Sequence, residues 1–176
     1  MTEKQIPLRN PLKIALGAVF AALGIVATLL LVISIPATSG YFNLGETVIY
    51  VAALLFGPLV GTIAGGGTMI ADVLVAAQFA PGTLLIKGFE GAIVGYLNSK
   101  IQRRTSSFIL SAAISVIVGG LEMVAGYFIY EQLALGYPMA VALVEVPFNF
   151  VQVLVGLIVA IAVVQVILRV FPQLKR

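Results

Sequence analysis

Residues 83–104, TLLIKGFEGAIVGYLNSKIQRR, are apolar enough to cross a bilayer, with two charged side chains, Lys87 and Glu90, near the start. An ionisable residue at membrane depth is costly, so these two side chains indicate a functional site that faces the protein interior. The stretch ends in three basic residues: Lys100, Arg103 and Arg104. Basic residues directly after a span are typical of its cytoplasmic end. The segment therefore predicts a membrane span, its orientation, and a site towards its outer end.

The whole chain has the composition of an integral membrane protein. Of its 176 residues, 61% are hydrophobic and 10% are charged, whereas soluble domains have about 25% charged residues. At about 20 residues per span, six helices with short loops would occupy nearly the whole chain as a single domain, 1–176. We therefore expect an all-α integral membrane protein with six transmembrane helices. The predicted helices cover about 11–34, 46–56, 59–79, 83–99, 107–131 and 139–170.

Residues that the chain lacks argue against several kinds of enzyme. It contains no cysteine and no histidine, so a thiol nucleophile, a disulfide, and the usual metal ligand and general base are all missing. The glycine-rich segment 61–68, GTIAGGGT, lacks the GK[ST] ending of a phosphate-binding loop. We expect no catalysis, no metal and no cofactor. The net charge of +3 does not indicate a nucleic-acid partner, because the basic residues are distributed as in a membrane protein.

Nine of the ten basic residues fall into three clusters, at the two termini and between the fourth and fifth predicted helices. The clusters are Lys4, Arg9 and Lys13; Lys100, Arg103 and Arg104; and Arg169, Lys175 and Arg176. The loops after the first, third and fifth predicted helices contain neither lysine nor arginine. This positive-inside pattern predicts that both termini lie in the cytoplasm.

The acidic residues follow the opposite pattern, since six of the seven lie between residues 46 and 145. With the predicted orientation and a rise of about 1.5 Å per residue, the polar groups fall in the outer halves of their helices. The sequence therefore predicts an outward-facing ligand pocket. The candidate binding residues on the helices are Lys87, Glu90, Glu122, Glu145, Asn149 and Asp72. Glu122 has no basic partner in the sequence and is the acid least easily explained by structure alone.

Spacing supports a shared site on the last predicted helix. Glu145, Asn149 and Gln152 are spaced i, i+4, i+7 and so share one helix face. Tyr127, near the top of its predicted helix, and Tyr41, in the first outer loop, could stack on a flat ligand. The alternative for both tyrosines is the aromatic belt that membrane proteins place at the interface.

Several of these residues also have a purely structural interpretation. Lys87 and Glu90 are three residues apart and can pair with each other, which would only fix the register of their helix. Asp72 can instead pair with Lys87 across two helices. Glu46 is interpreted either as a charge at a helix N-terminus or as a ligand contact. Glu131 is expected at the water interface with no specific role.

Small residues mark a second surface. Ala18 and Ala22 form an AxxxA pair in the first predicted helix, and such spacing lets another helix approach closely in lipid. Ordinary internal packing is the alternative explanation.

The AxxxA pair, the six-helix pattern and two long runs together resemble a known family. The runs are YFNLGETVIYVAALLFGPLVGTIAGGGTMIADVL at 41–74 and APGTLLIKGFEGAIVGYL at 80–97. They resemble the substrate-binding S components of energy-coupling factor (ECF) vitamin transporters, in the group with the riboflavin-type and hydroxymethylpyrimidine/pyridoxine-type proteins. The chain departs from the riboflavin pattern in having no tryptophan and prominent acids.

The resemblance implies a pocket formed by the outer parts of the last three helices and covered by the first outer loop, with Tyr41 and Asn43 in the lid. It implies a transmembrane T component and two ATP-binding-cassette ATPases as partners, so that ATP is used by the partners and not by this chain. Members of the family are thought to topple in the membrane, with the alanine face of the first helix, here Ala18 and Ala22, against the T component. The implied location is the cytoplasmic membrane of a prokaryote.

The favoured ligand is a small heteroaromatic vitamin or precursor, such as hydroxymethylpyrimidine or pyridoxine, because the carboxylates can accept hydrogen bonds from amines, ring N–H groups and hydroxyls. Riboflavin is the alternative within the family. Two hypotheses from other functional classes remain open at this point. The chain could be a membrane scaffold without a ligand, or an intramembrane hydrolase that uses paired carboxylates.

Overall fold

Seven α-helices and one short β-hairpin make up residues 10–105 and 107–174, the part of the chain that the computed structural model describes. The helices are α1 (Asn10–Leu30), α2 (Gly45–Phe56), α3 (Pro58–Gly67), α4 (Met69–Val75), α5 (Ala80–Gln102), α6 (Phe108–Leu133) and α7 (Met139–Val170). Strands β1 (Ile33–Ile35) and β2 (Gly40–Phe42) form the hairpin, and short 3-10 turns η1 (Ala77–Phe79) and η2 (Pro172–Leu174) complete the described elements.

The helices have the lengths and the composition of membrane spans. Four helical segments of the described chain are long and apolar enough to cross a bilayer: α1, α3 with α4, α6 and α7. Helix α5, with 23 residues, is about 35 Å long and carries the charged residues discussed above. Helix α2 has only 12 residues and is too short to span upright. The predicted class, an all-α integral membrane protein, is confirmed.

The first predicted helix, 11–34, extends too far. Helix α1 ends at Leu30, and the chain then pairs with itself as an antiparallel hairpin in which Ile33 lies opposite Phe42 and Ile35 opposite Gly40. The apolar run continues into β1, so hydropathy alone did not reveal where the helix ends. The turn of the hairpin contains Ser39, whose φ of 57° is in the left-handed region.

The third predicted helix, 59–79, is divided. Helix α3 ends after three consecutive glycines, and the Thr68 hydroxyl and backbone N–H both donate to the carbonyl of Gly65, at 2.7 and 3.1 Å, before α4 begins. Three glycines weaken a helix, which explains the break. Conversely, the predicted loop at 80–82 belongs to the first turn of α5, where Pro81 is tolerated because its missing N–H would have no helical partner.

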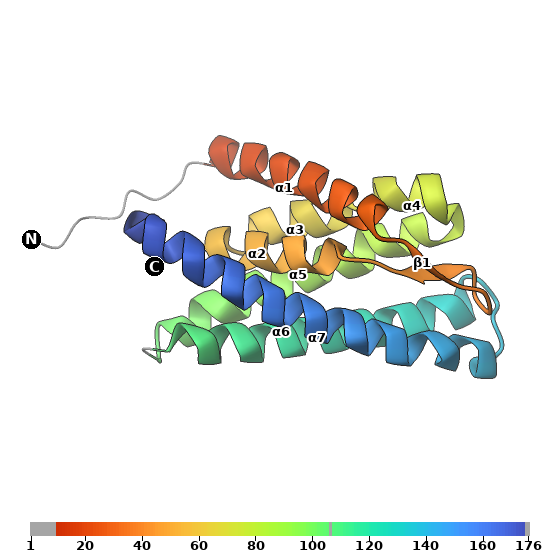
Figure 1. The fold of residues 1–176 in the computed structure, drawn as a ribbon. Coiled ribbons are helices and arrows are strands. Elements are labelled where there is room, and N and C mark those ends of the chain that lie inside the picture. The colour runs from red at the N-terminus through yellow and green to blue at the C-terminus, as the bar shows by residue number, and fades with distance from the viewer. Residues whose placement is uncertain (1–9, 106, 175–176) are drawn as a thin grey trace, which may run out of the picture.

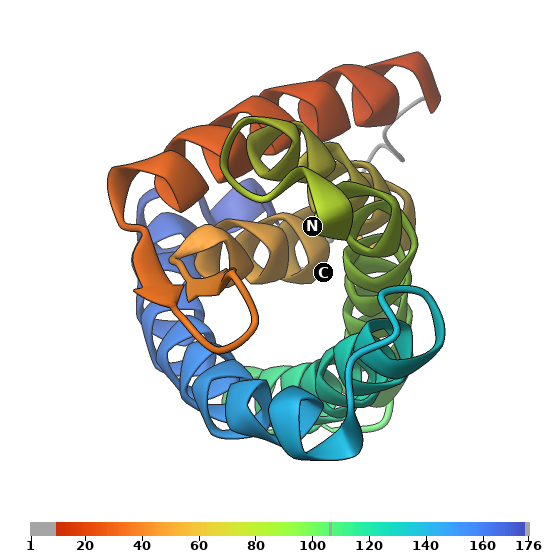
Figure 2. The ribbon, with the colours of Figure 1, turned by 90° about the vertical axis from the view of Figure 1, so that its right-hand side faces the viewer.

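The two ends of the helical bundle are made of different elements. Helix α1 begins, α5 ends and α7 ends at the same end of the bundle, whereas the hairpin, α4 and the α6–α7 connection lie at the other end (Figure 1). Seen from that second end, α5, α6 and α7 form a curved wall, α2 lies on its inner side, and the hairpin crosses beside α2 (Figure 2). Helix α2 contacts α1, α3, α5 and α7, and its Ile49 and Tyr50 are fully buried.

Helices α3 and α5 pack through glycines. A Cβ at Gly61 or at Gly91 would collide with the backbone carbonyl of the other residue, and a Cβ at Gly65 would collide with the carbonyl of Lys87. The two backbones can therefore approach this closely only because these positions carry no side chain. This contact places Lys87 at a fixed distance from α3 and from α4, which follows it.

Candidate ligand pocket

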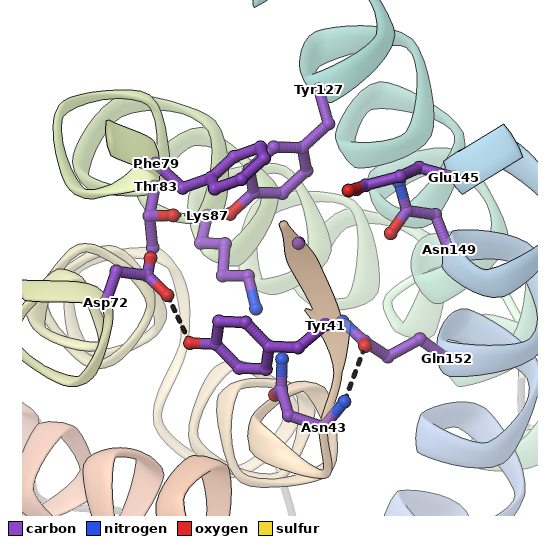
Figure 3. Close-up of a pocket in the computed structure, with 11 residues that line it drawn as sticks. Tyr41, Asn43, Asp72, Phe79, Thr83, Lys87, Tyr127, Glu145, Asn149 and Gln152 are labelled. Carbon is purple, nitrogen blue, oxygen red and sulfur yellow. Dashed lines mark hydrogen bonds between the residues drawn. The ribbon is translucent and has the colours of Figure 1, made fainter. Parts of the chain in front are cut away.

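A small cavity lies beside the hairpin, which contributes to its lining (Figure 3). The hairpin is at the end of the bundle opposite the start of α1 and the ends of α5 and α7 (Figure 1). The volume of the cavity is about 30 Å³. The hairpin, the connection after it, and helices α4, α5, α6 and α7 all contribute to its lining, together with η1. The lining residues are Gly40, Tyr41, Asn43, Asp72, Phe79, Thr83, Lys87, Tyr127, Glu145, Asn149 and Gln152.

Lys87 enters the cavity from α5 and pairs with a residue of α2. Its Nζ lies 2.6 Å from Oε1 of Glu46, and both side chains are buried, at 5% and 1% exposure. The Nε2 of Gln152 donates to the same carboxylate oxygen at 3.0 Å. Glu46 lies in the first turn of α2, where the helix dipole favours a negative charge. Glu46, Lys87 and Gln152 thus connect α2, α5 and α7 beside the pocket.

The pairing of Lys87 with Glu90, the structural alternative that their spacing allowed, is not formed. Glu90 instead accepts a hydrogen bond from the hydroxyl of Tyr50 at 2.6 Å and does not line the cavity. Three residues along a helix correspond to about 4.5 Å of rise, so Glu90 lies deeper in the bundle than Lys87. A partner on another helix, Glu46, reaches the ammonium group that Glu90 does not. The alternative pairing of Asp72 with Lys87 is not formed either: the ion pair of Lys87 is with Glu46, and the carboxylate of Asp72 accepts from the hydroxyl of Tyr41.

The hairpin is tied to the rest of the pocket by several hydrogen bonds. The hydroxyl of Tyr41 donates to Asp72 on α4, and the hydroxyl of Thr38 donates to Glu145 on α7. The backbone N–H of Asn43 donates to Oε1 of Gln152 at 2.9 Å (Figure 3). Burial, and then the negative charge of Asp72, raise the pKa of the Tyr41 phenol, so Tyr41 keeps its proton and remains a donor at neutral pH. The hairpin therefore covers the cavity as a lid held by side chains of α4 and α7.

We expect Tyr41→Phe to loosen this lid. The substitution removes the donor that Asp72 accepts, and leaving a buried acceptor without its partner costs about 1–3 kcal/mol. Amide hydrogen exchange in residues 33–42 should then become about tenfold faster or more. Tyr96→Phe is the matched control, since Tyr96 is 55% exposed on α5. Equal exchange rates in both variants and the unmodified protein would mean that this hydrogen bond does not hold the lid.

One wall of the pocket is aromatic. The rings of Phe79 and Tyr127 meet edge to face with centroids 6.4 Å apart. The hydroxyl of Tyr127 is 2.6 Å from Oγ1 of Thr83, which fixes the orientation of its ring. The ring of Tyr41 enters from the hairpin on another side of the cavity (Figure 3). Flat aromatic surfaces thus border a space that polar groups also reach, which is typical of sites for small heteroaromatic molecules.

Helix α7 supplies the polar wall on the opposite side. Glu145 and Asn149 project towards the cavity, one turn apart, and Gln152 follows on the same face (Figure 3). Within the described residues, the side-chain amide of Asn149 has no protein hydrogen-bond partner, although the residue is only 8% exposed. Its donor and acceptor are therefore free for a molecule in the cavity.

Most of the residues proposed from the sequence are brought together here. The cavity is lined by Lys87, Tyr127, Glu145, Asn149, Asn43, Tyr41 and Asp72. Their role as ligand contacts stays a prediction.

Glu122 does not line the cavity, contrary to the prediction. It lies on α6 five residues before Tyr127, and five residues rotate a helix position by about 140° relative to the residue that faces the pocket. Glu131 was expected at the water interface, but its side chain is fully buried. The connection after α6 folds back over it, since the N–H of Tyr137 donates to the carbonyl of Glu131 at 2.8 Å.

Four lining residues were not among the candidates: Gly40, Phe79, Thr83 and Gln152. For Gln152 a signal existed, because it shares the helix face of Glu145 and Asn149. The contribution of Gly40 depends on the hairpin, which the sequence did not predict. Among the described residues, no group of three or more acidic side chains is placed to hold a metal ion.

Comparison with known proteins identifies the family. A family model described as the ECF-type riboflavin transporter, S component, matches residues 9–169. The chain belongs to this family. It is 32% identical over 155 residues to the thiamine precursor transporter HmpT of Lactococcus lactis subsp. cremoris. The aligned region covers 86% of this chain and 85% of that protein. It is also 42% identical over 135 residues to an uncharacterised protein of Pyrococcus woesei, over 76% of this chain and 86% of the relative.

The predicted family is thereby confirmed, together with the general function. The S component is a membrane-integral transporter subunit for the uptake of a vitamin or vitamin precursor, and not an enzyme. The scaffold and hydrolase readings are not supported.

Proposed function

We propose that this S component captures a small, neutral heteroaromatic vitamin or precursor of the hydroxymethylpyrimidine or pyridoxine type. The observation that carries the proposal is the convergence of aromatic rings and unsatisfied polar groups on one lidded cavity. Phe79 and Tyr127 supply a ring face on one side, and Glu145 and Asn149 supply polar groups on the other. The 32% identity to a thiamine precursor transporter supports the same class of ligand.

In this proposal each group of the pocket has a defined part. The ring of the ligand lies against the aromatic wall, where offset or edge-on contacts are favourable. Exocyclic amino or hydroxyl groups donate to the carboxylates of Glu145 and Asp72, and the amide of Asn149 pairs with a ring nitrogen or a hydroxyl. Lys87 uses one of its three donors on Glu46 and can offer another to an acceptor of the ligand.

The size of the cavity also bears on the ligand. Its volume of about 30 Å³ is well below the roughly 300–1,000 Å³ of sites for drug-sized molecules, so the lid must move for any vitamin to enter. A single-ring compound requires less movement than a three-ring compound with a long side chain. Riboflavin is the second candidate, because the matching family model is described by that vitamin.

The proposed setting is the cytoplasmic membrane of a prokaryote, with both termini in the cytoplasm and the pocket facing outwards. All basic residues of the described chain except Lys87 lie at the end of the bundle opposite the pocket, which supports this orientation (Figure 1). Lys4, Arg9, Lys175 and Arg176, which also support it, lie outside the described residues. A transmembrane T component and two ATP-binding-cassette ATPases complete the proposed transporter and consume the ATP.

We expect one compound of a vitamin panel to stabilise the purified protein strongly against thermal unfolding. A ligand at 100 times its dissociation constant adds about 2.7 kcal/mol to the free energy of unfolding. The panel contains hydroxymethylpyrimidine, pyridoxine and riboflavin, and the compound that shifts the unfolding temperature names the substrate. Stabilisation by riboflavin alone would reject the single-ring proposal, and no shift with any compound would reject all three ligands.

A matched pair of variants tests whether the ligand binds in this cavity. Asn149→Leu removes a lining amide that has no hydrogen bond to the described residues, so it should reduce the ligand-induced shift with little effect on the free protein. Glu122→Gln is the control, because Glu122 lies outside the lining. If both variants kept the full shift, the ligand would bind elsewhere.

A further inference from the structure

Lys87 is the only basic residue between positions 14 and 99 of the chain, and among the described residues it is the only basic one that lines the pocket. Its positive charge would be the natural partner of an anionic ligand. In the structure this charge is already paired within the protein, because Nζ of Lys87 lies 2.6 Å from Oε1 of Glu46 and both side chains are buried. At this distance and burial, the glutamate balances the charge of the lysine within the protein.

Glu46 is held firmly in this position. It belongs to the first turn of α2, and Gln152 of α7 donates to the same oxygen that Lys87 contacts, at 3.0 Å. Gln152 in turn accepts from the backbone N–H of Asn43 at 2.9 Å, beside the lid. Glu46 itself does not line the cavity, so it affects the ligand only through its ion pair with Lys87.

The other charged groups of the pocket are both acidic. Asp72 and Glu145 accept hydrogen bonds from the neutral hydroxyls of Tyr41 and Thr38, and neither forms an ion pair within the described residues. With Lys87 balanced by Glu46, the groups around the ligand carry no net positive charge. A phosphate in this cavity would lose its hydration without gaining a cation, which is strongly unfavourable.

We propose that Glu46 is a specificity-determining residue, which by balancing Lys87 makes the pocket accept uncharged vitamers and reject their phosphate esters. This inference rests on the proposed function, since it concerns the ligand of the same site. It predicts that the transported compound arrives without a phosphate group. Any phosphorylated form required inside the cell would then be made after uptake by a phosphoryl-transfer reaction.

The test compares dissociation constants for three neutral compounds and their phosphate monoesters: hydroxymethylpyrimidine, pyridoxine and riboflavin. For the compound that binds, the unmodified protein should bind the phosphate ester at least about 100-fold more weakly. Glu46→Gln keeps an acceptor for Lys87 and Gln152 but removes the negative charge. It should narrow the ratio of the two dissociation constants about tenfold, because Lys87 then has no ion-pair partner and its ammonium group can pair with the phosphate at short range.

Three further variants separate charge from structure. Lys87→Gln should widen the same ratio, and the double variant with Glu46→Gln and Lys87→Gln should return it towards that of the unmodified protein, since both charges are then absent. Glu122→Gln is the charge-matched control and should leave the ratio unchanged, because Glu122 neither lines the pocket nor pairs with Lys87. A merely structural defect would weaken both members of a compound pair alike and would not move the ratio.

The outcomes for the inference and for the proposed function differ. If the unmodified protein binds a phosphate ester as tightly as its parent compound, the inference is overturned and the uptake function stands; this result requires no variant to fold. If Glu46→Gln is unstable, the ratios of Lys87→Gln and of the double variant decide. A ratio that Lys87→Gln does not widen, or one that stays equally wide in the double variant, overturns the role of Glu46. If none of the six compounds binds, the proposed ligand class fails and the inference fails with it.

Discussion

Replacing both Ala18 and Ala22 with leucine should abolish uptake while leaving ligand binding unchanged. Both alanines are exposed on the outer face of α1, which contacts α2, α3 and α4 through its other side. Small residues one turn apart let a second helix approach closely in a membrane, where packing drives association. Two leucines would hold the partner helix away. The pocket is lined by the hairpin, Asn43, η1 and helices α4 to α7, and no residue of α1 lines it.

The two activities are measured separately. Ligand binding is followed by thermal stabilisation of the purified protein, and uptake is followed in vesicles that contain the complete transporter. Ala125→Leu is the control, because it makes the same change at an exposed alanine on α6, away from α1. Uptake close to normal in the double variant would show that this face does not contact the T component, and lost binding would show that α1 shapes the pocket.

The membrane class and the ends of the bundle were predictable from the sequence because they depend on composition and on the placement of few charges. The basic residues are clustered at three points of the chain. The structure brings together the start of α1 and the ends of α5 and α7, the helix ends that carry Lys13, Lys100 and Arg169 (Figure 1). The distribution of charges depends on which parts of the chain face water and which face the bilayer. It can therefore be interpreted without knowing which helices contact each other.

The hairpin could not be predicted in the same way. Residues 33–35 are apolar, like the helix before them, and their pairing with 40–42 depends on contacts made far along the chain. Thr38 binds Glu145, and Tyr41 binds Asp72, at separations of 107 and 31 residues. The lid is therefore a tertiary feature, and only its place in the first outer loop followed from the family resemblance.

The residues that line the cavity were predicted from the sequence more successfully than the contacts between their side chains. Depth along a helix follows from residue count, which placed Lys87, Glu145 and Asn149 at the correct end. The direction of a side chain around the helix depends on its neighbours, and that failed for Glu122. The partner of Lys87 came from α2, a helix whose buried Glu46 had two open interpretations. Long-range ion pairs of this kind have no local spacing that would reveal them.

Gly91→Ala should destabilise the fold substantially, whereas Gly88→Ala, one turn earlier on α5, should not. Both substitutions replace glycine within the same helix, so each gains up to about 1 kcal/mol of helix propensity. At Gly88 the nearest atom to an added Cβ lies 3.8 Å away, which is an ordinary contact. At Gly91 the added Cβ would overlap the backbone carbonyl of Gly61 on α3.

Because that neighbour is backbone, it cannot move aside as a flexible side chain can, and the two helices must separate. Overpacking of this kind costs about 1–3 kcal/mol, more than the gain in propensity. Thermal unfolding of the two purified variants without ligand measures the difference directly. The same separation would displace Lys87, whose carbonyl lies against Gly65 on α3, so Gly91→Ala should also weaken ligand binding. Equal stability of the two variants would mean that α3 and α5 are not held at this distance by their glycines.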